Sequence, residues 1–204
     1  MNVLGFLSVK FMSHYYQFDK QLKSLEKQIT YQFNNHTFSF ITDHGVFSME
    51  HVDHGSDVLL HTIDYEDYKH VLDVGSGYGV LGCVLKTLHP NAKVTMFDVN
   101  PRAVALSKKN TAHLEDVVVI ESDFVPEGLY DLVVMNPPIR AGKKIIFDLY
   151  TQIYQHMTSK SAFYIVISKR HGAPSHQAFL KTMFDAVDRV KKSKGYDVYK
   201  AIKY

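Results

Sequence analysis

Tryptophan is absent from the 204-residue chain, and cysteine occurs only once, at Cys83. A single cysteine can form neither an intramolecular disulfide framework nor a cysteine metal cluster, so the sequence predicts an intracellular protein. No apolar run approaches the roughly 18 residues that a membrane-spanning helix needs. The first residues also lack the basic segment and cleavage site of a signal peptide. A secreted or membrane-spanning protein is therefore not expected.

A strong net charge is missing too, because the formal net charge is only +2. With 46% hydrophobic and 22% charged residues, the composition is typical of an ordinary globular domain. The charge is nevertheless uneven, since residues 181–204 hold seven Lys/Arg against three Asp. This surplus is either a phosphate-facing patch or a solvated face at the chain end.

Metal binding is not predicted, although the chain has 12 histidines. His44, His51 and His54 are close in sequence, but their spacing does not match a zinc-ligand pattern with a fourth partner. Solvated loop histidines are the better interpretation.

The first 64 residues differ in pattern from the rest of the chain. Two β-rich segments, 29–33 and 37–42, flank Asn34-Asn35-His36 and predict a hairpin. A short helix is expected at 57–64, with Ser56 or Asp57 as its cap. We therefore expect an extension at 1–64 that packs on a core at 65–204, so that the chain forms effectively one domain.

From residue 70 onward, buried strand patterns alternate with helical patterns. Helices are predicted at 79–88, 101–112, 143–158 and 174–184. Continuous apolar strands are predicted at 70–74, 93–98, 117–120, 131–135 and 162–168. This alternation favours an α/β fold with a doubly wound parallel sheet. The last two strands, 186–192 and 196–202, are joined by so short a loop that they must be antiparallel.

A glycine loop follows the first of these strands, in the stretch "VLDVGSGYGVLG". Gly75, Gly77 and Gly79 with Ser76 would let a ligand approach main-chain N–H groups at a helix start. The pattern departs from a dinucleotide fingerprint, because Asp73 stands before the first glycine and position 80 is valine. An acid there suits a ligand with an ammonium group, such as the amino-acid end of S-adenosylmethionine.

Two further acids stand at the ends of the next strands. Asp98, followed by Val99, lies 21 residues after Gly77 and is placed to accept hydrogen bonds from ribose hydroxyls. Asp123 is placed for an adenine amino group, and Phe124 beside it is expected to cover the ring. Three acids at consecutive strand ends predict one cofactor site.

The fourth strand ends in "MNPPIRAGK", where two prolines follow Asn136. Pro137 and Pro138 stiffen an extended turn, since proline fixes φ and has no N–H. The Asn136 side-chain oxygen and the Pro137 carbonyl can together accept both N–H groups of a planar exocyclic amine. Such acceptors would stabilise the positive charge that develops on nitrogen during methylation.

These motifs together resemble class I S-adenosylmethionine-dependent methyltransferases. The segments at 14–16, 47–60, 71–82, 98–110, 136–143 and 194–200 are similar to the short, single-domain form of the 16S ribosomal RNA guanine-N2 methyltransferase family. The resemblance implies a seven-stranded sheet in the order 3-2-1-4-5-7-6. It also implies a cytoplasmic enzyme that transfers methyl to guanine N2 in small-subunit rRNA, either naked or in an assembled subunit.

The resemblance also assigns roles to single residues. Asp73, Gly75 and Gly77 would hold the methionyl part of the cofactor, and Asn136 with Pro137 the target amine. Ile139 stands where many amino-methylating relatives have an aromatic residue, so Phe47 or Tyr15 is expected to stack on the base instead.

Phe47, Ser48 and Asp53 are expected to form a lid over the cofactor. Contacts with RNA near a flipped base are expected from Arg140, Lys143, Lys144, Lys169 and Arg170.

Other functions stay open from the residues themselves. Adenine N6 and a protein glutamine amide are planar nitrogens to which the two-acceptor argument applies equally. A noncatalytic RNA-binding module that retains the fold is a third hypothesis.

Overall fold

The computed structural model describes residues 22–204, which form two sheets and five helices. Tyr15 and the motif at 14–16 lie outside these residues. An N-terminal hairpin consists of β1 (Lys27–Phe33) and β2 (His36–Thr42). The main sheet contains β3 (His70–Val74), β4 (Lys93–Asp98), β5 (Val117–Glu121), β6 (Tyr130–Met135), β7 (Met157–Ser168), β8 (Ala186–Ser193) and β9 (Tyr196–Lys203). The helices are α1 (His54–Leu60), α2 (Val80–Leu88), α3 (Pro101–Thr111), α4 (Lys143–Gln155) and α5 (Ala173–Leu180), with 3-10 turns η1 (Ile139–Ala141) and η2 (Lys169–His171).

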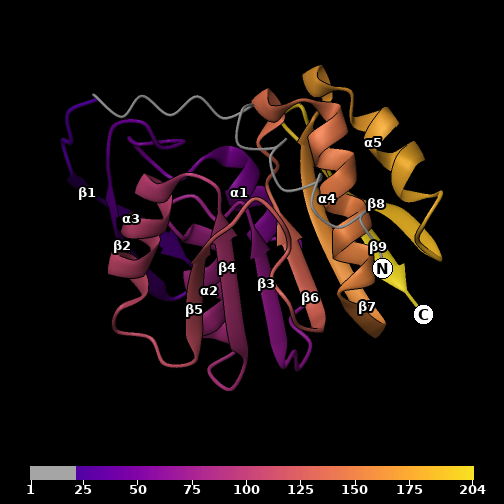
Figure 1. The fold of residues 1–204 in the computed structure, drawn as a ribbon, viewed down its shortest axis with the longest axis horizontal. Helices are drawn as coiled ribbons and strands as arrows, with labels where there is room; N and C mark the ends of the chain where they lie inside the picture. The colour runs from indigo at the N-terminus through magenta and orange to yellow at the C-terminus, as the bar shows by residue number, and fades with distance from the viewer. Residues whose placement is uncertain (1–21) are drawn as a thin grey trace, which may run out of the picture.

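The seven strands of the main sheet run in the order β5-β4-β3-β6-β7-β9-β8 (Figure 1). Counted from β3, this is the order 3-2-1-4-5-7-6. The first five strands pair in parallel, and β9 pairs antiparallel with both of its neighbours. The expected α/β fold and its antiparallel last strand are therefore confirmed.

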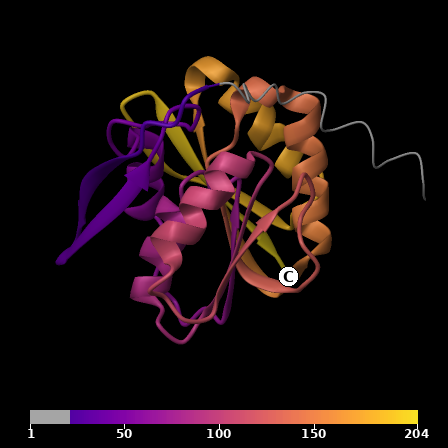
Figure 2. The same ribbon diagram turned by 60° about the vertical axis from the view of Figure 1, so that its left-hand side comes forward.

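Both faces of the sheet are covered, which explains the continuous apolar strands. Val71 belongs to an apolar cluster with residues of α1, α2 and α3, whereas the next residue, Leu72, packs with residues of α4 and α5. Successive side chains of a strand point to opposite faces, so each central strand must be apolar throughout. Figure 2 shows the hairpin and α4 on opposite sides of the sheet.

The hairpin is attached to the core by apolar packing and by hydrogen bonds to α3. Phe33 and Phe40 are buried in the same cluster as α2 and the sheet. The Asn110 side chain accepts a hydrogen bond from the Ile41 N–H (2.8 Å) and donates one to the Ile41 carbonyl (3.0 Å). The division of the chain at residue 64 stays a prediction.

The helix expected at 57–64 is α1, which begins three residues earlier, at His54, and ends four residues earlier, at Leu60. Its N-cap is Asp53, not Ser56 or Asp57, and the Asp53 carboxylate accepts the Ser56 N–H at 3.1 Å. Aspartate is among the best N-cap residues, and the weak helix former Gly55 is tolerated in the first turn. Asp53 therefore starts a helix, and it also lines the cavity described below together with Phe47 and Ser48, so the lid stays a prediction.

Three other boundaries were wrong. The hairpin turn holds only Asn34 and Asn35, since His36 pairs with Phe33. The helix expected at 143–158 ends at Gln155, and β7 begins at Met157 in a polar stretch with no apolar signal. The helix expected at 174–184 ends at Leu180, where tight turns lead into β8.

Candidate active site

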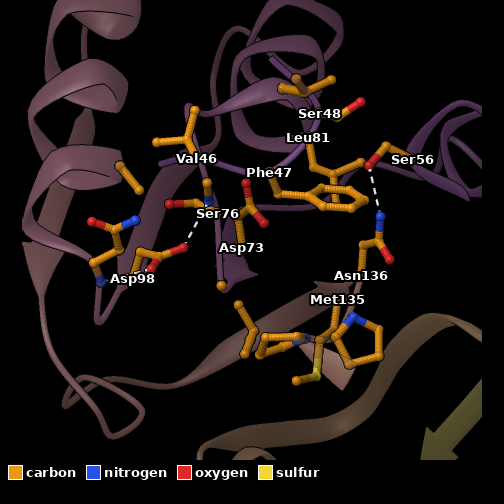
Figure 3. Close-up of a pocket in the computed structure, with 18 of the residues that line it drawn as sticks. Val46, Phe47, Ser48, Ser56, Asp73, Ser76, Leu81, Asp98, Met135 and Asn136 are labelled. Carbon is orange, nitrogen blue, oxygen red and sulfur yellow. Dashed lines mark hydrogen bonds between the residues drawn. The ribbon is translucent and has the colours of Figure 1, made fainter. Parts of the chain in front are cut away.

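The carboxyl ends of β3, β4 and β6 lie next to one another, and a cavity of about 830 Å³ opens beside them (Figure 3). Ligands of open α/β sheets bind at this edge, and the volume is typical of a small-molecule site. The cavity is lined by the predicted residues Phe47, Asp73, Gly75, Ser76, Gly77, Asp98, Val99, Asp123, Asn136, Pro137, Pro138, Ile139 and Arg140. Gly79, Phe124 and Lys143 were also predicted for the site, but they do not line it.

The glycine loop contains residues with two different tasks. A β-carbon on Gly77 would meet nothing within 4 Å, so the loop is open there to a ligand. A β-carbon on Gly79 would lie 2.8 Å from Ser107 Oγ and 3.1 Å from Met96 Cε. Gly79 has a φ of 99° and is the N-cap of α2, so it is needed for the turn and for close helix packing. The structure thus assigns Gly79 to packing and not to the cavity wall.

Asp73 is a completely buried carboxyl group at the floor of the cavity. Its Oδ2 accepts the Gly82 N–H at 2.9 Å, whereas Oδ1 has no hydrogen-bond partner among the described residues. Burial raises the pKa of Asp73 to about 7. A buried carboxylate without a full set of partners is costly, so a cationic group placed against it would be bound strongly.

Asp98 lies at the end of the neighbouring strand and shapes the loop that faces it. Its two oxygens accept N–H groups of Gly77 (2.9 Å) and Asn100 (2.8 Å). Burial raises the pKa of Asp98, and these backbone hydrogen bonds partly oppose the rise. The carboxylate keeps free lone pairs toward the cavity, which is compatible with the expected acceptance of ribose hydroxyls.

The adenine end of the expected site is only partly as predicted. Asp123 lines the cavity together with Ser122. Phe124 does not line it and is 42% exposed, so the expected cover over the adenine ring stays a prediction. The Ser122 side chain accepts the Phe124 N–H and donates to the Phe124 carbonyl, which fixes this local turn. Sequence adjacency to Asp123 could not reveal the direction of the ring.

Asn136 directly follows β6, and its side chain is held from one side. Its Nδ2 donates to Asp53 Oδ1 and to Ser56 Oγ, both at 3.0 Å. Figure 3 shows the contact with Ser56 and the amide oxygen turned away from it. Because a carboxylate can only accept, the nitrogen of the amide must face Asp53, and the oxygen remains available to a ligand.

The rim of the cavity combines predicted and unpredicted side chains. Phe47 is 67% exposed and can cover a bound group, while Arg140 lies on the short turn after the prolines. Lys143 begins α4 outside the cavity lining. His171 and Tyr196 line the cavity and were not predicted, although Tyr196 lies within the segment 194–200 that resembles the family.

Neither a metal site nor a membrane span is found in the part of the chain that the structure describes. Residues 22–204 contain no group of three or more His, Cys, Asp or Glu side chains that could hold a metal ion. None of the helices between these residues combines the length and the apolar character that crossing a bilayer requires.

Residues 37–200 match the sequence model of a family described as Methyltransferase small domain. The chain belongs to this family. It is a class I methyltransferase with S-adenosylmethionine as its cofactor, so the predicted family, enzyme class and cofactor are confirmed.

Two relatives of this methyltransferase differ in how much of their length it covers. It is 36% identical over 197 residues to the protein YbxB of Bacillus subtilis (strain 168). That alignment covers 93% of this chain and 98% of the relative. It is 35% identical over 129 residues to ribosomal RNA small subunit methyltransferase C of Haemophilus influenzae Rd. That alignment covers 60% of this chain and 39% of the relative, so the chain spans less than half of the longer protein.

A solved structure shares the fold of this methyltransferase. It is a T. thermophilus 16S rRNA N2 methyltransferase in complex with AdoMet and guanosine. The TM-score is 0.78 at 23% identity, over 90% of this chain and 52% of that chain. At this identity the likeness establishes the fold, and the target of methylation must be argued from the site.

Proposed function

We propose that this methyltransferase acts on an exocyclic amino group, and that its target is guanine N2 in 16S rRNA. The observation that carries the proposal is the fixed Asn136 amide, whose nitrogen is held by Asp53 and Ser56. Asn136 and the neighbouring Pro137 both line the cavity, and we assign the amide oxygen and the Pro137 carbonyl as a pair of acceptors there. Two acceptors match the two N–H groups of a planar amine.

The residues of the cavity suit a cofactor that carries a methyl group on a sulfonium. We assign Asp73 to the ammonium of the amino-acid part, Asp98 to the ribose and Asp123 to the adenine. Asp73 fits this assignment because its buried Oδ1 has no other partner among residues 22–204. Ser76, Gly77 and Val99 complete the wall between these acids.

On the acceptor side, Asn136 and Pro137 supply orientation and charge stabilisation. A conjugated amino group is a poor nucleophile because its lone pair is delocalised into the ring. Hydrogen bonds to both N–H groups favour the geometry in which the lone pair points at the methyl, and they stabilise the positive charge that develops. The methylated nitrogen then loses its proton easily, so this chemistry needs no strong general base.

An RNA substrate is supported by a cluster of cations near the cavity. Lys169 in η2 and Lys192 in β8 lie close together, and the Lys169 N–H donates to Gly195 in the β8–β9 turn at 2.8 Å. Partial desolvation and the neighbouring Lys192 ammonium lower the pKa of Lys169. His171, at the end of η2, lines the cavity itself. Asp197 lies beside these groups and pairs with Arg189, so the cluster keeps a net positive charge that a phosphate backbone crossing η2 would meet on its way into the site.

The relatives support the same target. The ribosomal RNA small subunit methyltransferases C of Haemophilus influenzae Rd and Buchnera aphidicola are 35% and 32% identical to this chain over the matched parts. A structure with the same fold was solved with guanosine. Because the chain spans at most half of these proteins, we transfer their substrate to it as a proposal, together with a cytoplasmic location.

The experiment that tests the proposal offers tritiated S-adenosylmethionine with three acceptors: undermodified 30S subunits, naked 16S rRNA and release factors. We expect label in RNA, and label in protein would instead indicate glutamine methylation. The variant Asn136→Ala distinguishes an enzyme from a noncatalytic RNA-binding module. A binding module would show no turnover before or after this change, whereas we expect turnover in the wild type and its loss in the variant.

A further inference from the structure

We propose that Asp53 is a positioning residue that sets the orientation of the Asn136 amide, with Ser56 as its second support. The inference rests on the proposed function, in which the amide oxygen of Asn136 accepts the target amine. It goes further because it makes the active orientation of Asn136 depend on a residue from a different part of the chain. Asp53 and Asn136 are 83 residues apart in sequence.

The need for such a residue follows from the chemistry of the amide. The final torsion of asparagine is broad and roughly two-fold, so an unsupported amide presents either oxygen or nitrogen to a ligand. Only the oxygen can accept from the target amine, and the reversed amide would place N–H groups against N–H groups. An unsupported amide is thus unproductive when it is reversed, and it is loosely placed against the amine when it is not.

The contacts of Asn136 remove this ambiguity. Nδ2 lies 3.0 Å from Asp53 Oδ1 and 3.0 Å from Ser56 Oγ. A reversed amide would set its oxygen against the Asp53 carboxylate, and two acceptors at this distance repel each other. The Ser56 hydroxyl can donate as well as accept, so it cannot choose the orientation by itself. Asp53 is therefore the residue that decides.

Asp53 is itself fixed by the start of α1. Its Oδ1 accepts the Ser56 N–H at 3.1 Å, which is the N-cap contact of the helix. The helix is anchored in the core, because Leu59 and Leu60 are fully buried. One carboxylate oxygen thus joins a rigid helix start to the side chain that touches the substrate.

Gly55 makes the approach of these groups possible. A β-carbon at this position would lie 2.9 Å from Asp53 Oδ1, 3.2 Å from the Tyr196 ring and 3.4 Å from Asn136 Nδ2. The first distance is shorter than ordinary contacts, so a side chain would have to displace the carboxylate. The stretch Asp53-His54-Gly55-Ser56 thereby combines cap, clearance and second support in one turn.

The test compares Asp53→Ser with Asp53→Asn. Serine still caps a helix but is too short to keep both contacts. Asparagine has a carbonyl oxygen at the same length, and the Ser56 N–H that this oxygen accepts as the helix cap keeps the oxygen, not the amide nitrogen, toward Asn136. Asp131→Ser is the matched control, since Asp131 also accepts backbone N–H groups, from Lys69 and His70, but at the opposite end of the sheet. For each variant we would measure kcat, the KM for S-adenosylmethionine and the midpoint of thermal unfolding.

We expect kcat of Asp53→Ser to fall about 10- to 100-fold, the cost of a misplaced reacting group. Its KM for S-adenosylmethionine should match that of the control, and Asp53→Asn should recover most of the loss. The inference is overturned if Asp53→Ser matches the control in kcat, or if its loss lies in cofactor binding. It is also overturned if Asp53→Asn is as poor as Asp53→Ser, because the negative charge and not the acceptor would then matter.

Two further variants keep the result interpretable. Gly55→Ala perturbs the same contact without removing Asp53. It should lower kcat, while the KM for the cofactor changes by a smaller factor. An unaltered kcat would contradict the inference. Asn136→Ala separates this inference from the proposed function. If Asn136→Ala retains turnover, the proposed function fails. If Asn136→Ala loses turnover while Asp53→Ser and Gly55→Ala retain it, only the positioning role fails.

Discussion

Asp73 shows how burial prepares one carboxyl group for a cationic ligand. Its pKa is raised to about 7 by burial, and its Oδ1 has no partner among the described residues. The folded pKa lies above the unfolded value of about 3.9, so protonation favours the folded state. The contribution of this group to stability is complete below about pH 4 and is lost as the pH rises through about 7.

The variant Asp73→Asn tests the raised pKa of Asp73 in the free protein and its role in binding the cofactor. In the free protein, the free energy of unfolding of the wild type should decline more between pH 4 and pH 7 than that of the variant. The ammonium of the cofactor selects the ionised carboxylate, so wild-type affinity should rise with pH up to about 7. Calorimetric titration with S-adenosylmethionine should show that rise in the wild type only. An equal pH dependence in Asp73→Asn would contradict the assignment.

Asn136→Ala tests the acceptor that faces the substrate. Loss of one preorganised hydrogen-bonding group at a reacting centre typically costs about 100- to 1,000-fold in kcat. We expect a loss of this size, because Asn136 and Pro137 are the acceptors assigned to the amine. The dissociation constant for S-adenosylmethionine should change little, since Asp73 and Asp98 remain. An unchanged kcat would remove Asn136 from the mechanism.

At the scale of an element, the start of α2 depends on Gly79. Alanine at this position would have to adopt a φ of 99° and would contact Ser107 and Met96. We expect Gly79→Ala to lower the free energy of unfolding by about 2–4 kcal/mol, from backbone strain and overpacking together. Gly195→Ala is the control, since its φ is 86° but a β-carbon there meets nothing within 4 Å. Denaturant unfolding should show the smaller loss in Gly195→Ala, and equal losses would argue against close packing at Gly79.

The β8–β9 hairpin and η2 are the elements that we expect to contact RNA. Lys192→Glu should raise the KM for RNA and make binding less sensitive to salt, because one phosphate contact is lost. Lys108→Glu on α3 changes the charge equally at the far edge of the sheet and serves as the control. The KM for S-adenosylmethionine should stay the same in both variants. If the two variants shift the KM for RNA equally, the proposed cation cluster is not the RNA surface.

The elements that could be predicted from sequence are those with a repeating pattern. Strands such as β3, which contains Val71, are apolar on both faces, and the glycine loop follows the end of β3. The polar start of β7 gave no such signal, because Thr158, Ser159 and Lys160 are only partly buried or exposed. The start of α1 could not be fixed from the sequence, because Ser56 and Asp57 are N-cap residues as good as Asp53.

At the scale of the whole molecule, the sequence located the site but not its internal contacts. Acids that end consecutive strands meet at one sheet edge by topology alone, so Asp73 and Asp98 could be assigned to one cavity. The hydrogen bond between Asp53 and Asn136 joins segments that are distant in sequence, and no repeating pattern of residues predicts it. Side-chain direction also escapes sequence patterns, as the exposed ring of Phe124 shows.

The most direct test of the central claim is the identity of the methylated nucleoside. Undermodified 30S subunits and naked 16S rRNA are incubated with the purified protein and S-adenosylmethionine, digested to nucleosides and analysed by mass spectrometry. We predict that N2-methylguanosine accumulates with the wild type and does not accumulate with Asn136→Ala. Accumulation of N6-methyladenosine, or methyl transfer to release factors without any methylated guanosine, would contradict the claim.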